Sequence, residues 1–256
     1  MGILNVTPDS FSDGGEAYSI EKALQKTIQL IQDGADIIDI GGESTRPNAQ
    51  VISVEEEISR VIPVIKKIRE MNISITISVD TRNYLTAKLA IEAGANIIND
   101  VSGLDYDPLL FDYVAKNDIP VIIMHSDKVP ANSKDIETND IIEEVYYSLY
   151  KKIEKLLSNG HSKNNIIIDV GIGFGKSQQT NFQLLKRMDE FTSLGVPILL
   201  GISRKSFIRN EFDLDFEHAD ITTALYSAML KSVNIHRVHN VALTRKYLDF
   251  ASKIAP

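Results

Sequence analysis

The chain has 256 residues, of which 43% are hydrophobic and 24% are charged, and its formal net charge is −8. This composition excludes a collagen, a coiled coil and a disordered chain, the acidity argues against a nucleic-acid-binding protein, and no apolar run reaches the ~20 residues of a membrane span. The absence of cysteine excludes disulfides, thiolate metal sites and a cysteine nucleophile, and it favours a cytoplasmic location.

Short runs rich in Ile and Val recur along the chain, and each is followed by polar or glycine residues. The candidate strands are residues 2–6, 36–40, 74–79, 96–98, 121–124, 166–169, 198–200 and 235–238. Helical patterns lie between them, and apolar residues spaced by three and four positions run from Ile20 to Ile31 and from Ile58 to Ile65. Ser53 and Glu56 have the spacing of a capping box before the second of these helices.

The alternation of strand and helix predicts parallel strands with crossover helices, because no Pro-, Ser- or Gly-rich linker divides the chain. Eight such units indicate an α/β protein, a single (β/α)8 TIM barrel that spans residues 1–256 as one domain. The alternative is a doubly wound open sheet, which needs a glycine-rich phosphate loop where residues 5–15 are long and polar. Gly34-Ala-Asp-Ile-Ile recurs as Gly94-Ala-Asn-Ile-Ile, which indicates either repeated units or a common helix-to-strand transition.

Polar residues stand two positions after inward-facing residues at the ends of four candidate strands. They are Asp80, Asn99, Asp169, Arg237 and His239. One buried Asp is often structural, but five convergent polar positions are hard to attribute to chance, since unpaired buried charges cost several kcal/mol. Catalytic groups of barrels lie at this end of the strands, so the sequence predicts a polar ligand site at the barrel mouth.

The segment 169–177 is rich in glycine and contains Gly-Lys-Ser, which resembles part of a P-loop. The spacing excludes that motif, because Val170 stands where a glycine is needed. The glycines predict instead a tight loop close to a planar ligand, with Phe174 as its apolar surface.

Residues 201–207 follow the seventh candidate strand and open a helix, which places backbone N–H groups beside Lys205 and Ser206. This arrangement predicts a seat for an anion or a carboxylate, and the alternative is an ordinary capped helix with solvated cations. The polar, glycine-containing loops at residues 7–15 and 41–48 are interpreted as mobile loops over the mouth or as plain surface loops.

Seven segments, taken in chain order, resemble the motifs of the dihydropteroate synthase family: residues 2–15, 39–47, 78–81, 98–103, 171–176, 203–207 and 237–239. The resemblance covers essentially the whole chain. It implies a TIM barrel that acts as a transferase of folate biosynthesis and a sulfonamide target, with Mg²⁺ as cofactor. In the implied reaction, 6-hydroxymethyl-7,8-dihydropterin pyrophosphate condenses with p-aminobenzoate to give 7,8-dihydropteroate and pyrophosphate.

The same resemblance implies the partners of the chain. They are the two small-molecule substrates and a second copy of the chain in a homodimer, with no nucleic acid and no membrane. The sequence starts directly on the first candidate strand, which is compatible with a missing leading segment or with fusion to another folate-pathway module.

The resemblance also implies roles for individual residues. The pterin pocket would consist of Asp80, Asn99, Asp169 and Lys205, and such groups can pair with the alternating donors and acceptors of a pterin edge. The diphosphate would be held by Asn5, Arg237 and His239, with Asn5 as the protein ligand of the metal. The residues around p-aminobenzoate would be Phe11, Thr45, Arg46, Pro47, Phe174 and Ser206.

The implied mechanism needs no protein nucleophile, because a dihydropterin can delocalise positive charge from its methylene carbon as the bond to pyrophosphate breaks. The catalytic residues would be Lys205, Arg237 and His239, and the last two would stabilise the charge of the leaving diphosphate together with Mg²⁺.

Several positions depart from the family pattern. Ser126 stands where a Met is common, Val170 where a Pro is usual and Asn240 where an Asp is usual, and residues 219–223 lack an expected Gly-Thr before a helix. Position 240 therefore lacks a carboxylate that could orient His239. These departures motivate two alternatives, a catalytically silent pterin-binding paralogue and a pterin-dependent methyltransferase barrel, although the latter has no use for a diphosphate group.

Overall fold

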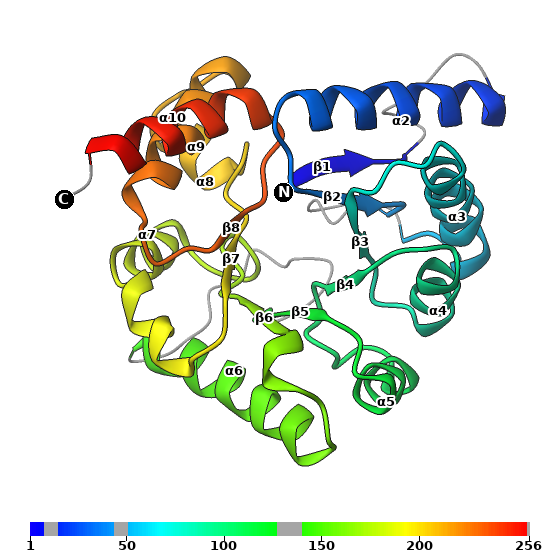
Figure 1. Ribbon diagram of the computed structural model, residues 1–256. Helices are drawn as coiled ribbons and strands as arrows, with labels where there is room; N and C mark the ends of the chain where they lie inside the picture. Colours follow the sequence, from blue (N-terminus) through cyan, green and yellow to red (C-terminus); the bar gives the residue numbers. More distant parts are fainter. Residues whose placement is uncertain (8–14, 44–50, 127–139, 255–256) are drawn as a thin grey trace.

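The computed structural model describes residues 1–7, 15–43, 51–126 and 140–254. In these ranges eight parallel strands form one sheet in sequential order, and the helices surround it (Figure 1). The strands are β1 (Gly2–Asn5), β2 (Ile37–Gly41), β3 (Thr76–Asp80), β4 (Ile97–Asp100), β5 (Val121–Met124), β6 (Ile166–Asp169), β7 (Ile198–Leu200) and β8 (Ile235–His236). Each of the predicted strands is therefore present.

The sheet is closed into a barrel by backbone hydrogen bonds between the first strand region and Val238, two residues beyond the last strand. The Val238 amide donates to the Met1 carbonyl at 3.0 Å, and the Ile3 amide donates to the Val238 carbonyl at 3.1 Å. This seam, together with the sequential order of the strands, confirms the (β/α)8 barrel and excludes the doubly wound open sheet.

Helices alternate with the strands along the chain. They are α2 (Gly15–Gln32), α3 (Val54–Glu70), α4 (Tyr84–Glu92), α5 (Pro108–Asn117), α6 (Ile141–Ser158), α7 (Gln178–Lys186), α8 (Ser206–Glu211), α9 (Phe216–Met229) and α10 (Val241–Ile254), with short 3₁₀ helices η1 (Lys163–Asn165) and η2 (Met188–Leu194). The predicted cap of α3 is present, because the Ser53 side chain accepts from the Glu56 amide at 3.2 Å.

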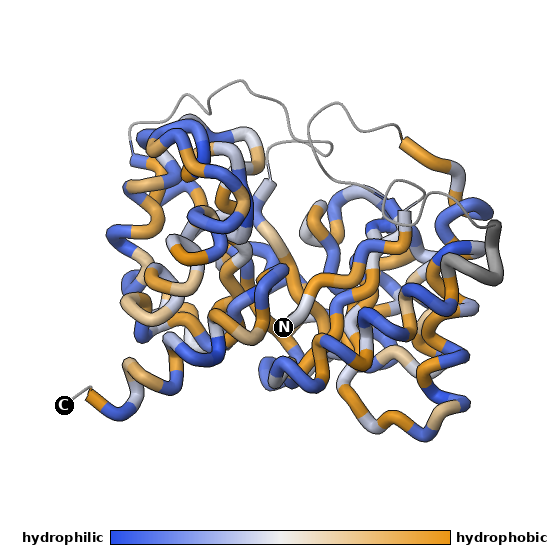
Figure 2. Tube along the Cα trace, turned by 90° about the horizontal axis from the view of Figure 1, so that it is seen from above, coloured by the Kyte–Doolittle hydropathy of each residue, from blue (hydrophilic) through white to orange (hydrophobic). Residues whose placement is uncertain are grey.

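The apolar residues divide into two layers. One set of strand residues, such as Ile38 and Ile40, points outward and is buried against the helices. A smaller cluster that includes Ile97, Ile122 and Leu199 comes from the alternate positions, which fill the barrel interior. Along the helices, hydrophobic and hydrophilic residues alternate (Figure 2). No helix in the described ranges has the length and apolarity that crossing a membrane would require.

The two Gly-Ala repeats have the same structure. Gly94 lies two residues beyond α4 with a φ of +111°, and a Cβ there would lie 2.8 Å from Arg69 Cγ. The Arg69 guanidinium donates from Nε and Nη2 to the Gly94 carbonyl at 3.0 and 2.8 Å, and Nη2 also donates to Asn96 Oδ1 at 2.9 Å. An arginine of the preceding helix thus clips the end of α4 to the start of β4.

Gly34 repeats this arrangement at the end of α2. Its φ is +92°, and Arg245 of α10 donates from Nε and Nη2 to the Gly34 carbonyl at 3.2 and 2.7 Å. Arg245 Nη2 also donates to Asp36 Oδ2 at 2.7 Å, and Asp36 corresponds to Asn96 in the repeat. This shared clip favours repeated units over a chance similarity of two helix-to-strand transitions.

We expect Arg69→Met to destabilise the protein by about 2 kcal/mol, because the substitution removes charged hydrogen bonds and leaves backbone carbonyls without them. The carbonyls of Ile73 and Ile75 lose bonds of 2.8 Å from the same guanidinium. Urea unfolding measures the change. Lys67→Met on the same helix is the control, since the Lys67 side chain is 52% exposed and its ion pair with Glu70 lies on the surface. Equal losses for both variants would show that the clip carries no special stability.

Candidate active site

Charged side chains and small residues alternate around the carboxyl ends of the strands. Asp80 ends β3, Asp169 ends β6 and Arg237 directly follows β8. A Cβ at Gly41, the end of β2, would lie 3.4 Å from Asp80 Cβ, and one at Gly201 would lie 3.9 Å from Arg237 Cβ. The two glycines therefore leave room for the charged side chains beside them.

Arg237 lies between two carboxylates. Its Nε donates to Asp39 Oδ2 at 2.6 Å, and its Nη2 donates to Asp80 Oδ2 at 2.7 Å. Asn99 joins the same group, because its side-chain amide donates to Asp39 Oδ2 at 3.2 Å. Residues of β2, β3, β4 and the end of β8 thus meet through one guanidinium.

Asp39 is the site residue that the sequence interpretation did not single out. It follows Ile37 by two positions in β2, which is the same alternation that identified Asp80, Asn99 and Asp169. The signal was therefore present, but Asp39 stands inside a candidate strand rather than at its end. In the structure its side chain is fully buried.

Burial perturbs the pKa values of the acidic side chains at the mouth. Burial raises the pKa of Asp80 to about 7; Arg237 opposes that rise and Asp39 adds to it. Burial also raises the pKa of Asp169, against the opposing effect of Lys205. Perturbed carboxylates that converge in one place are typical of a functional site.

Lys205 and Phe174 lie in the loops that follow β7 and β6. Lys205 Nζ lies 4.5 Å from the centre of the Phe174 ring and donates to the Ile172 carbonyl. Phe174 packs in a small buried cluster with Val101 and Met124, and Met124 is the register partner of Asp169. An apolar surface therefore lies next to the charged groups, as the sequence predicts for Phe174.

Lys176 donates hydrogen bonds to the backbone of the glycine-rich loop that follows β6. Its Nζ donates to the carbonyls of Gly171 at 2.9 Å, Phe174 at 3.2 Å and His125 at 3.3 Å. A Cβ at Gly171, where φ is +70°, would lie 1.8 Å from the His125 carbonyl oxygen. Lys176 thus holds backbone rather than a phosphate, which supports the exclusion of a P-loop.

His239 is held by Ser203. Ser203 Oγ lies 2.9 Å from His239 Nδ1, and the His239 amide donates to the same oxygen at 3.1 Å. Asn240 instead directly precedes α10 and caps it, because its Oδ1 accepts from the Leu243 amide at 3.1 Å. Ser203 therefore contacts His239 where the carboxylate usual at position 240 is missing.

The expectation for residues 219–223 is corrected. These residues lie inside α9 rather than before a helix. Asp220 accepts two hydrogen bonds from Arg204, at 2.8 Å from Nε and 2.7 Å from Nη2. The segment therefore fixes the loop between β7 and α8, in which Arg204 has a φ of +59°.

The remaining predicted site residues divide into two groups. Asn5 ends β1 beside Gly41, and Ser206 is the exposed first residue of α8. The other predicted p-aminobenzoate residues, Phe11, Thr45, Arg46 and Pro47, lie outside the described residues.

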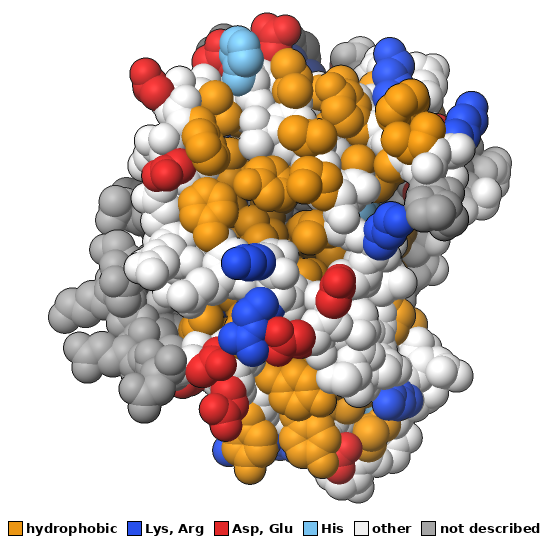
Figure 3. All heavy atoms as spheres, turned by 90° about the vertical axis from the view of Figure 1, so that its left-hand side faces the viewer, with side chains coloured by type: hydrophobic (Ala, Val, Ile, Leu, Met, Phe, Trp, Pro, Cys, Tyr) orange, Lys and Arg blue, Asp and Glu red, His pale blue; other side chains and the backbone are white. Residues whose placement is uncertain are grey.

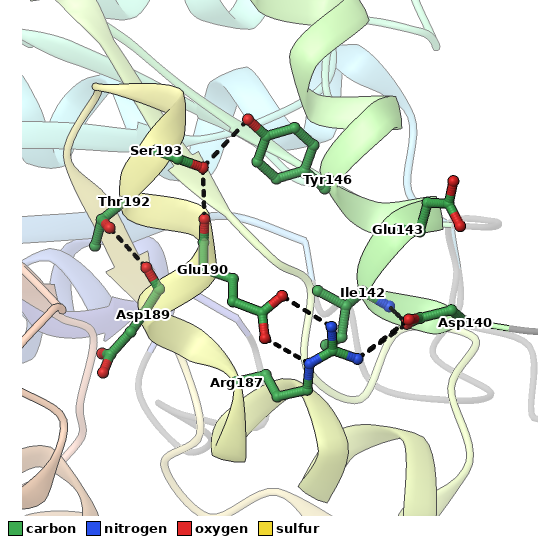
Figure 4. A pocket seen from close by; sticks show the side chains of 9 residues that line it. All are labelled: Asp140, Ile142, Glu143, Tyr146, Arg187, Asp189, Glu190, Thr192 and Ser193. Atoms are coloured by element: carbon green, nitrogen blue, oxygen red, sulfur yellow. Dashed lines mark hydrogen bonds and ion pairs between the residues drawn. The ribbon is translucent and has the colours of Figure 1, made fainter.

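A surface pocket away from this mouth has a different character. It lies between the start of α6 and η2 (Figure 4), where Arg187 donates to Glu190 at 2.6 and 2.8 Å and to Asp140 at 3.2 and 3.3 Å. Ser193 Oγ donates to the Tyr146 hydroxyl at 3.2 Å. These side chains are paired with one another, and none of the predicted site residues lines the pocket.

We expect an unusually acidic ammonium at Lys205. Burial lowers the pKa of Lys205 to about 8, while Asp169 holds it up. The lysine should therefore lose its charge as the pH rises through 8, and Asp169→Asn should lower the pKa further. NMR of ¹³C-labelled lysine measures both values. Asp36→Asn, at the other end of the barrel, is the control, and an ordinary lysine pKa in the wild type would contradict the assignment.

A family model described as pterin binding enzyme matches residues 1–239. A dihydropteroate synthase of Streptococcus pyogenes is 45% identical over 99% of this chain and 94% of the relative. A probable bifunctional folylpolyglutamate synthase/dihydropteroate synthase of Haloferax volcanii is 43% identical over 94% of this chain, which matches 29% of that longer protein.

Solved structures agree with these relatives. The crystal structure of a Clostridium difficile dihydropteroate synthase in the presence of pteroic acid has a TM-score of 0.93 and 38% identity, and covers 100% of this chain and 95% of that one. The enzyme of Xanthomonas albilineans in complex with 7,8-dihydropteroate has a TM-score of 0.87 and 36% identity, with coverage of 100% and 94%.

Proposed function

This chain belongs to the dihydropteroate synthase family, and we propose that its barrel mouth condenses 6-hydroxymethyl-7,8-dihydropterin pyrophosphate with p-aminobenzoate. The observation that carries the proposal is the ring of Asp80, Asn99, Asp169, Lys205 and Arg237 at the carboxyl ends of the strands. The ligands named for two structural relatives are 7,8-dihydropteroate, which is the product of this reaction, and pteroic acid, which is its oxidised analogue.

The pterin is assigned to the carboxylate side of the ring. Asp80 and Asp169 can accept hydrogen bonds from ring and amino N–H groups, and Asn99 can both donate and accept. Lys205 can donate to a ring oxygen or nitrogen, and Phe174 beside it offers an apolar surface to a planar ring. A buried site of this kind discriminates strongly, because a ligand that lacks one partner leaves a polar group unpaired.

The diphosphate is assigned to Arg237 and His239. As the C–O bond breaks, its electron pair stays on the pyrophosphate oxygen, and positive charge develops on the pterin methylene. Arg237 stabilises the growing negative charge, while Asp80 and Asp169 favour the cationic pterin. The p-aminobenzoate nitrogen then forms the new bond to the methylene carbon and releases its proton to solvent.

Mg²⁺ is part of the proposal through Asn5. In the described part of the chain, no group of three or more His, Cys, Asp or Glu residues is arranged to hold a metal. Asn5, at the end of β1, would supply one amide oxygen, and the other ligands would be substrate oxygens and water, which suits a cation that keeps its waters. When bound, Mg²⁺ supplies neutralisation of diphosphate charge.

The p-aminobenzoate site is proposed at Phe174 and Ser206 on the basis of the resemblance. Phe11, Thr45, Arg46 and Pro47 complete that proposal, and their structure is outside the described residues. A dihydropteroate synthase of Yersinia pestis has been crystallised with a sulfonamide drug complex, and we expect sulfonamides to compete with p-aminobenzoate here as well. We also propose that the chain acts in the cytoplasm and that residues 1–256 form one functional barrel. In the Haloferax volcanii relative, the matching region is part of a longer, probable bifunctional folylpolyglutamate synthase/dihydropteroate synthase.

The test is pyrophosphate release from the dihydropterin pyrophosphate, with and without p-aminobenzoate and Mg²⁺. We expect release and formation of dihydropteroate only when both are present, and EDTA should abolish it reversibly. Asp169→Asn should reduce kcat/KM about 10- to 100-fold, because it removes a charged hydrogen-bond acceptor. Tight pterin binding without turnover would favour the silent paralogue, and methyl transfer to a corrinoid would favour the methyltransferase; either result would refute the proposed reaction.

We also propose that the chain forms a homodimer, and an exposed apolar face of α9 and α10 supports this. Ile221, Leu225 and Met229 form one stripe on α9 and are 39%, 49% and 65% exposed. Phe250 and Ile254 on the neighbouring helix α10 are 65% and 67% exposed. Apolar side chains gather on this side of the molecule (Figure 3), and contiguous exposed patches of this kind mark association surfaces.

We expect Leu225→Glu to convert the dimer to a monomer, because it places a charge in the centre of the apolar stripe. Light scattering coupled to size-exclusion chromatography measures the mass. Leu85→Glu on α4 is the matched control, since Leu85 is 45% exposed and lies on a different helix. A wild type that elutes with the mass of one chain, or a control that dissociates equally, would contradict the assigned interface.

A further inference from the structure

Asp39 connects two parts of the mouth through a single oxygen atom. Its Oδ2 accepts from Arg237 Nε at 2.6 Å and from the Asn99 side-chain amide at 3.2 Å. We propose that Asp39 is a positioning residue that fixes Arg237 and Asn99 relative to each other. If the proposed function holds, these two residues meet the diphosphate and the pterin, so Asp39 couples the two ends of the substrate site.

The burial of Asp39 excludes direct contact with substrate in this arrangement. Its side chain is 0% exposed, and the Oδ1 atom is buried without a hydrogen-bond partner among the described residues. The Asp39 carboxylate is therefore closed off from the mouth. It acts on a ligand only through the groups that it holds.

The orientation of Arg237 depends on both of its carboxylates. Asp39 occupies Nε and Asp80 occupies Nη2, which together fix the plane of the guanidinium. In the described part of the chain, no hydrogen bond involves Nη1, which leaves that nitrogen for a ligand. A neutral side chain at position 39 would free one edge of the guanidinium, which could then turn toward Asp80 alone.

Barrel stability is a poor explanation for Asp39. Its neighbour in register, Ser78, is buried with an Oγ that has no hydrogen-bond partner among the described residues, so the carboxylate and the hydroxyl do not satisfy each other. A buried ion pair is often no better for stability than a well-packed apolar pair. A costly buried charge that holds two site residues fits a functional role instead.

A double-mutant cycle with Asp39→Asn and Arg237→Met tests the proposal. Asparagine keeps the shape and one acceptor but removes the charge. Calorimetry with Mg²⁺ and pyrophosphate, and separately with 6-hydroxymethylpterin, measures binding at each end. We expect Asp39→Asn alone to weaken pyrophosphate binding about tenfold and pterin binding by a smaller factor. In the Arg237→Met background, Asp39→Asn should leave pyrophosphate binding unchanged, because the group through which it acts is gone.

A stability measurement supplies a second readout that needs no ligand. Arg237→Met leaves Asp39 and Asp80 without their shared cation and should lower the melting temperature. Adding Asp39→Asn to that variant should raise the melting temperature again, since one of the two buried charges is removed. Asp36→Asn, which breaks a 2.7 Å ion pair at the other end of the barrel, is the matched control and should change neither pyrophosphate nor pterin binding.

Three results would overturn the proposal: wild-type pyrophosphate affinity in Asp39→Asn, an equal loss in both backgrounds, or a loss in the Asp36 control. If Asp39→Asn does not fold, NMR of the wild-type arginine Nε–H groups decides. A signal that disappears in Arg237→Met and exchanges slowly with water supports the Asp39 bond, and fast exchange refutes it. If the wild type binds both ligands but forms no product, the proposed reaction fails while the cycle still tests Asp39.

Discussion

The Arg237 guanidinium pairs with two buried carboxylates at the mouth of this barrel. Arg237 binds Asp39 of β2 and Asp80 of β3, and through Asp39 it is linked to Asn99 of β4. Without that cation the mouth would hold buried carboxylates with little to offset them, since Lys205 lies toward Asp169. The position of Arg237 just past β8 therefore makes the electrostatics of the site depend on how the last strand pairs with the first.

Much of the fold follows from period-two patterns in the sequence. The apolar runs predicted each strand within a few residues, because a parallel barrel strand is buried on both faces and reads as continuous Ile and Val. The same alternation predicted Asp80, Asn99 and Asp169. Asp39 obeys that rule too, but it stands within a strand, where a polar residue is usually interpreted as an interruption of the strand.

Other parts of the site depend on tertiary contacts that no local pattern encodes. The orientation of His239 comes from Ser203, which is 36 positions away in the chain. The sequence around Lys176 resembles a phosphate-binding loop, but in the structure its Nζ donates to three backbone carbonyls. The repeated glycines at 34 and 94 are recognisable in the sequence, but the arginines that clip them lie on other helices.

The seam between β1 and β8 has a consequence for how the chain is made. Arg237 bonds Asp39 across 198 positions and Asp80 across 157, so a chain emerging from the ribosome presents both carboxylates long before their cation. Until Arg237 is available, burial of the two carboxylates together is unfavourable. This cost favours an open, hydrated state of the incomplete sheet. Synthesis of the final strand supplies the missing positive charge and the missing backbone partners together, so the step that closes the sheet also assembles the site.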